Sequence, residues 1–112
     1  MVDLYVLFGV ATKDIDEARS WVETALARKL AEDEKGHLGR YCFLDGSDRE
    51  ALKLCSGVSQ DDEEGEYPTD QDFPDEALLI FLDDTRDDSP WLRALEARPD
   101  RFVKLRANRY ED

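Results

Sequence analysis

The sequence contains few of the residues that most often carry catalysis or bind transition metals. His37 is the only histidine, and Cys42 and Cys55 are the only cysteines. Twelve residues separate the two cysteines, whereas zinc sites use paired, closely spaced ligands. Nucleophilic catalysis needs a base beside a serine or cysteine, and His37 lies in the glycine-flanked loop "KGHLG". We therefore expect a protein that is not an enzyme, with no catalytic residue, no metal site and no cofactor.

Long apolar segments are also missing. No run approaches the ~20 apolar residues that cross a bilayer, which argues against a membrane partner. Met1 leads directly into a strand-like run, without the basic region and the small-residue cleavage site of a signal peptide. Without an export signal, the two cysteines are expected to be reduced thiols, so we expect a cytoplasmic protein.

Basic residues are scarce in the middle of the chain. The chain has 28 acidic and 15 basic residues, for a net charge of −13. Residues 45–88 contain sixteen of the acidic residues and three of the basic ones. A field of this sign repels nucleic acid and attracts basic surfaces. The charge therefore predicts a basic protein partner and no nucleic acid.

The remaining composition and pattern predict one folded domain over residues 1–112. Hydrophobic residues make up 41% of the chain, and eleven residues are aromatic. Helices are expected to begin after the caps Asp14 and Ser89, with Pro90 in the first helical position. Strand-like runs cover residues 3–10, 40–45, 50–55, 76–84 and 101–109. This β-α-β-β-β-α-β order predicts an α+β fold, a ferredoxin-like variant with a single-layer, mostly antiparallel sheet and two helices packed on one face.

The segment "DDEEGEYPTDQDFPDE", residues 61–76, concentrates the acidic charge, since nine of its sixteen residues are acidic. A calcium-binding EF-hand needs glycine at the sixth position of its loop, but a loop that starts at Asp61 has Glu66 there. We expect an acidic loop at about residues 57–75, with Phe73 anchored on the domain and the carboxylates facing outward. Two other interpretations are a mobile, solvated loop and a loop neutralised by bases of the last strand, Lys104, Arg106 and Arg109.

Clustered carboxylates with aromatic neighbours suit a surface that binds a basic protein, because charge guides association and apolar groups add contact. The candidate partner-binding residues are Asp61, Asp62, Glu63, Glu64, Glu66, Tyr67, Asp70, Asp72, Asp83 and Asp84. Asp87 and Asp88 are possible extensions of this patch.

Several stretches resemble one protein family in their order. They are "LYVLFGVATKDIDEARSWVETAL", "HLGRYCFLDG", "EALKLCSGV", the acidic segment, "FPDEALLIFLDD" and "FVKLRANRYED". Together they resemble bacterial toxin-immunity proteins, in particular those of contact-dependent growth inhibition and related polymorphic toxin systems. The resemblance implies a small, acidic, cytosolic α+β protein that binds and blocks one cognate toxin domain, often a nuclease.

Two alternatives remain open. An acidic mimic of nucleic acid would bind a DNA-binding protein through the same charge. The stretch "FGVATKDIDEARSWVETAL" is also similar to the opening of glyoxalase-like metal enzymes. Those enzymes commonly take a metal ligand from the first strand, where this sequence offers only Asp3.

Overall fold

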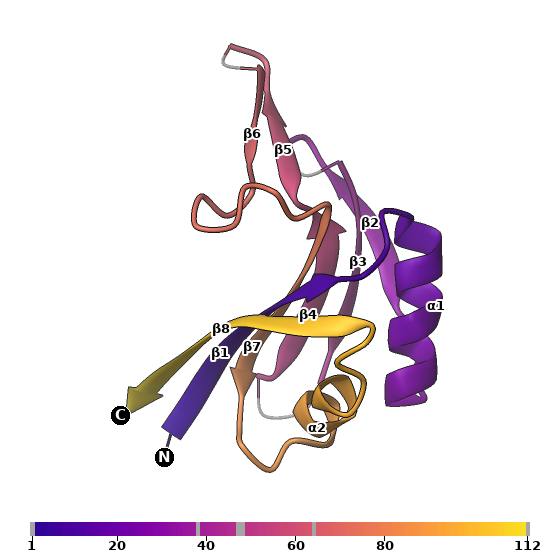
Figure 1. The fold of residues 1–112 in the computed structure, drawn as a ribbon, viewed down its shortest axis with the longest axis vertical. Coiled ribbons are helices and arrows are strands. Elements are labelled where there is room, and N and C mark those ends of the chain that lie inside the picture. Colours follow the sequence, from indigo (N-terminus) through magenta and orange to yellow (C-terminus); the bar gives the residue numbers. More distant parts are fainter. Residues whose placement is uncertain (1, 38, 47–48, 64, 112) are drawn as a thin grey trace.

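The computed structural model describes residues 2–37, 39–46, 49–63 and 65–111. Its elements, in chain order, are β1 (Val2–Val10), α1 (Ile15–Leu26), β2 (Ala31–Lys35), β3 (Gly39–Asp45), β4 (Ala51–Ser56), β5 (Val58–Asp61), β6 (Gly65–Pro68), β7 (Leu78–Thr85), α2 (Pro90–Glu96) and β8 (Phe102–Glu111). Figure 1 shows the curved main sheet, the helices α1 and α2 beside it, and a narrow hairpin of β5 and β6 that projects from the top.

The main sheet has six strands in the order β2-β3-β4-β7-β1-β8, and β5 and β6 form a separate two-stranded sheet. Every neighbouring pair is antiparallel. Without β2, β3, β5 and β6, the chain follows β1-α1-β4-β7-α2-β8 with the strand order β8-β1-β7-β4. This is the connectivity of a ferredoxin-like fold, so the predicted α+β class with two helices and a mostly antiparallel sheet is confirmed.

Both helices begin where the sequence predicts. The Asp14 side chain accepts hydrogen bonds from the backbone N–H groups of Asp16 and Glu17. The Ser89 side chain accepts one from Leu92, and Pro90 occupies the first turn of α2. These bonds satisfy N–H groups that have no partner inside a helix. Both helices pack on the same face of the sheet, where Val22 of α1 and Leu95 of α2 are fully buried.

The core has two layers, one on each face of the sheet. Leu4, Val6 and Phe8 of β1 join the larger layer beneath the helices. The opposite face, which we call the open face, carries a smaller cluster. It consists of Leu7, Tyr41, Cys55 and Leu79, with Phe43, Phe73, Phe81 and Leu105 packed against it. Because β1 contributes to both layers, its two apolar faces match its position between β7 and β8.

Three strands were not expected from the sequence. β2 reads AEDEK and lacks apolar alternation, but it pairs with β3 from Ala31–Phe43 to Lys35–Gly39. Val22, Leu26 and Leu30 recur at helical spacing in the sequence, which predicts a helix that reaches Leu30. In the structure α1 ends at Leu26, because Ala27 turns to a left-handed conformation, φ 55°. Leu30 is nevertheless buried in the helix-side core. The other two unexpected strands, β5 and β6, form a hairpin from the first half of the expected acidic loop.

Candidate functional site

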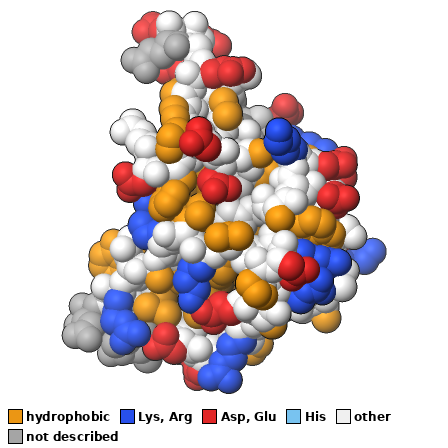
Figure 2. All heavy atoms as spheres, viewed as in Figure 1, with side chains coloured by type: hydrophobic (Ala, Val, Ile, Leu, Met, Phe, Trp, Pro, Cys, Tyr) orange, Lys and Arg blue, Asp and Glu red, His pale blue; other side chains and the backbone are white. Residues whose placement is uncertain are grey.

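The β5–β6 hairpin projects from the body of the sheet (Figure 1) and carries a group of acidic residues. Asp61, Asp62, Glu63 and Glu66 are all exposed on it. The strands pair from Val58–Pro68 to Asp61–Gly65, and Gly65 takes the positive φ of 77° that the turn needs. Figure 2 shows acidic side chains gathered over this projection, while the Lys and Arg side chains visible in this view lie lower on the body. On the face shown in Figure 2, the hairpin therefore presents negative charge away from the basic side chains.

The base of the hairpin is fixed to the domain by hydrogen bonds. Thr69 N–H donates to the Gly57 carbonyl at 2.9 Å, and Gly57 N–H donates to the Ala77 carbonyl at 2.8 Å. The Thr69 hydroxyl donates to the Ser56 carbonyl at 2.9 Å and lies 2.7 Å from the hydroxyl of Ser59, which is buried. A Cβ on residue 57 would lie 1.7 Å from the carbonyl oxygen of Glu76, so only glycine fits there. This network fixes the direction in which the hairpin projects.

Two of the predicted binding acids are held by the protein itself. Arg106 donates to both carboxylate oxygens of Asp70, at 3.3 and 2.6 Å, and to Asp72 at 3.2 Å. The Arg106 guanidinium keeps the pKa of Asp70 below its ordinary value. The expectation that bases of the last strand neutralise the acidic loop therefore applies to Arg106, whereas Lys104 pairs with Glu96 and Arg109 with Asp87. Asp70 and Asp72 stabilise the segment after the hairpin.

Tyr67 and Phe73, the two aromatic residues of the acidic segment, have different surroundings. Tyr67 lies on β6 opposite Ser59 and is partly exposed, so it can add apolar contact beside the acids of the hairpin. Phe73 packs against the core cluster of the open face, in agreement with its predicted role as an anchor. Glu64, another predicted binding residue, lies outside the described residues.

Asp83 and Asp84 lie far along β7 from the hairpin, at a β-bulge. Leu4 pairs with Thr85 and Val6 with Leu82, so Asp83 and Asp84 together oppose the single residue Tyr5. Asp84 takes the left-handed conformation, φ 52°, and accepts a 2.7 Å hydrogen bond from the Tyr5 hydroxyl. Burial raises the pKa of Asp83, although Lys53 opposes the shift. The structure thus separates these two residues from the acids of the hairpin.

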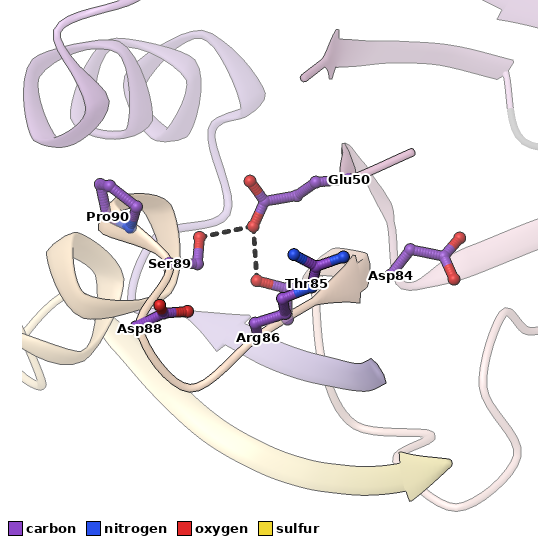
Figure 3. A pocket seen from close by; sticks show the side chains of 7 residues that line it. All are labelled: Glu50, Asp84, Thr85, Arg86, Asp88, Ser89 and Pro90. Atoms are coloured by element: carbon purple, nitrogen blue, oxygen red, sulfur yellow. Dashed lines mark hydrogen bonds between the residues drawn. The ribbon is translucent and has the colours of Figure 1, made fainter. Parts of the chain in front are cut away.

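A further depression lies between β4, the end of β7 and the start of α2 (Figure 3). At its centre the Glu50 carboxylate accepts hydrogen bonds of 2.5 Å from the hydroxyls of Thr85 and Ser89. The Ser89 oxygen in turn accepts the N–H of Leu92 as the helix cap. Because both hydroxyls are used to attach α2 to the sheet, we interpret this network as structural.

The described part of the chain offers little for metal or thiol chemistry. It contains no group of three or more His, Cys, Asp or Glu side chains that could hold a metal ion. Cys42 and Cys55 are free thiols buried in different core layers. Burial raises the pKa of both and brings that of Cys55 to about 11, which disfavours the reactive thiolate. Within the described ranges, neither helix has the length and apolar character needed to cross a bilayer.

The fold and this surface define a small α+β protein of ferredoxin-like connectivity with a projecting acidic hairpin. Comparison of the sequence with protein-family models and with curated proteins finds no match.

Two aromatic side chains that the sequence does not mark as a site meet on the sheet at the bulge. Tyr5 of β1 and Tyr110 of β8 contact each other edge to face, with ring centroids 4.9 Å apart. The signal was present in the alternation of the two strands, which places every second residue on one face. The pairing of the first strand with the last, however, is a property of the tertiary fold.

Proposed function

We propose that this protein is an inhibitor of the immunity type, which binds and neutralises one cognate bacterial toxin domain with a basic surface, of which a nuclease is the best example. The observation that carries the proposal is the exposed group Asp61, Asp62, Glu63 and Glu66 on a hairpin with a fixed base. In this proposal the hairpin enters or covers the basic surface of the toxin.

Negative charge and apolar surface on the hairpin both favour binding to a basic protein surface. A nuclease binds phosphates through basic side chains, so an acidic protein surface can occupy the same region. Exposed carboxylates accelerate association by long-range attraction, and this effect weakens as salt screens it. Val58, which is 38% exposed, and the partly exposed Tyr67 add apolar surface beside the acids. Asp70 and Asp72 contribute less to the attraction, because Arg106 already pairs with both.

The first experiment co-expresses this chain with the product of the adjacent reading frame and measures association at low and at high salt. The test variant carries Asp61→Asn, Asp62→Asn, Glu63→Gln and Glu66→Gln. The matched control removes four exposed acids elsewhere, through Glu17→Gln, Glu34→Gln, Asp45→Asn and Asp75→Asn. Both variants have the same net charge, so only the location of the lost charge differs.

We expect tight one-to-one binding that weakens with salt. At low salt the hairpin variant should associate about tenfold more slowly than the control variant, because charge near the contact dominates the attraction. Equal rates for the two variants would place the interface elsewhere. If the adjacent product is toxic alone but does not bind this chain, the immunity proposal fails.

An acidic mimic of nucleic acid is tested by the same assay. A mimic should bind several unrelated basic proteins with similar affinity, whereas an immunity-type inhibitor should select one.

A further inference from the structure

A second surface feature lies at the other end of the sheet from the hairpin, near the two chain ends (Figure 1). It is a pocket lined by Asp3, Tyr5, Arg49, Asp84 and Tyr110. These residues come from the start of β1, the turn before β4, the end of β7 and the end of β8. The proposed steering role of the hairpin does not use this pocket.

The pairing of β1 with its two neighbours builds the pocket. On one side, the bulge places Asp84 opposite Tyr5, whose hydroxyl donates to Asp84. On the other side, Asp3 pairs with Tyr110 in β8. The Tyr110 ring is therefore the diagonal neighbour of Tyr5, and the two rings meet at 88°. Tyr110 is 55% exposed, so much of this large aromatic side chain is accessible to a ligand.

The carboxylates of Asp3 and Asp84 place negative charge beside the aromatic pair. Asp3 is 9% exposed. The pKa of Tyr5 is raised, first by its hydrogen bond to Asp84, then by burial and by the negative charges of Asp84, Asp3 and Asp83. A carboxylate accepts several hydrogen bonds, so Asp84 can accept a second donor while it holds the Tyr5 hydroxyl.

The protein places one of its own arginines at this pocket. Arg49 donates to Asp3 across a long distance of 3.5 Å, and 75% of its side chain is exposed. Its backbone has a φ of 70°, which is unusual for a residue other than glycine. Because this contact is long and exposed, a guanidinium that forms shorter hydrogen bonds with Asp3 can displace Arg49.

We propose that this pocket binds an arginine side chain of a partner protein. The guanidinium lies on the ring of Tyr110 and donates to the carboxylates of Asp3 and Asp84, replacing Arg49. Aromatic faces attract cations, and the planar guanidinium both stacks on rings and donates several hydrogen bonds to carboxylates. Binding of a free arginine probe is independent of any toxin, while the role of the pocket in a complex rests on the proposed function.

The test is a titration followed by two-dimensional NMR of the untagged chain. The probe is Nα-acetyl-arginine amide, with the neutral citrulline analogue and the lysine analogue as comparisons. We expect saturable shifts at the amides of Tyr5, Asp84 and Tyr110 with the arginine probe, and none with citrulline. Shifts spread over the acidic hairpin, or a response of the pocket to lysine equal to that to arginine, would overturn the assignment.

Two variants test the mechanism further. Tyr110→Ala should weaken binding of the arginine probe by about two- to fivefold, the usual strength of an exposed cation–π contact. Arg49→Asn, which keeps a residue tolerant of the left-handed backbone, should strengthen binding because it removes the internal competitor. Lys29→Asn removes the same charge at an exposed position after α1. Equal affinities for the Arg49 and Lys29 variants would show that general charge, and not displacement of Arg49, controls binding, and would contradict the proposal.

Discussion

At the scale of single residues, Arg106 determines which acids of the segment after the hairpin are available to a partner. Its guanidinium contacts Asp70 and Asp72 and lies 5.8 Å from the centre of the Phe73 ring. One side chain of β8 thus joins two carboxylates and an aromatic anchor to the open face. A charge pattern in the sequence cannot distinguish such paired acids from exposed ones, because the partner lies more than thirty residues away.

This pairing predicts how stability depends on pH. Arg106 lowers the pKa of Asp70 from its ordinary 3.8 in the folded state. The unfolded chain therefore binds the proton first, and the stabilisation present above that value is lost as the pH falls through the folded pKa. Asp70→Asn should lower the free energy of unfolding by about 1 kcal/mol at neutral pH. In acid, the variant and the parent protein should have the same free energy of unfolding.

Urea unfolding at a series of pH values checks this expectation. Asp72→Asn is the matched control, because Asp72 contacts the same guanidinium but its side chain is 76% exposed. An effect of Asp72→Asn as large as that of Asp70→Asn would contradict the assigned role of Asp70.

At the scale of elements, the sequence predicts the features that are determined by residues close together in the chain. The caps Asp14 and Ser89 mark the helix starts, and the two apolar faces of β1 mark a central strand. The short strands β2, β5 and β6 escape prediction because they are rich in polar residues and are stabilised by pairing. For the site, the sequence locates the acids of the hairpin. The bulge at Asp84 and the contact of Tyr5 with Tyr110 depend on strand register, which no local pattern encodes.

The hairpin should be removable as a unit. Thr69 N–H donates to the Gly57 carbonyl, which is the hydrogen bond that closes a β-turn when two residues lie between. We expect that replacement of residues 58–68 by Asn-Gly leaves the six-stranded sheet intact, since neither core cluster includes a residue of this range. Circular dichroism should then show a cooperative melt, while binding of the partner is lost. Failure of this variant to fold would mean that the hairpin supports the sheet.

At the scale of the whole molecule, the net charge of −13 sets a balance between attraction and repulsion. Half of the ion pairs formed by the described residues have both side chains exposed, and exposed pairs of this kind contribute little to stability. The excess of negative charge instead destabilises the compact state by self-repulsion. Salt should therefore stabilise this protein, because screening weakens the repulsion more than it weakens the exposed pairs.

Thermal unfolding at increasing NaCl measures this balance. We expect the Tm to rise with salt, by about 4 °C for each kcal/mol gained at this chain length. The variant that neutralises four hairpin acids changes the net charge from −13 to −9, so its Tm should rise less. A Tm that falls with salt would mean that the ion pairs outweigh the repulsion.

The two cysteines lie in different layers of the molecule. Cys42 packs among the residues beneath the helices, and Cys55 packs on the open face, each fully buried. An alkylating reagent can reach each thiol only when its own layer separates from the sheet. In variants that keep only one of the two cysteines, the rate of alkylation would therefore measure how often that side of the sheet opens. Comparison of the two rates would show whether the helices or the open face separates from the sheet more readily.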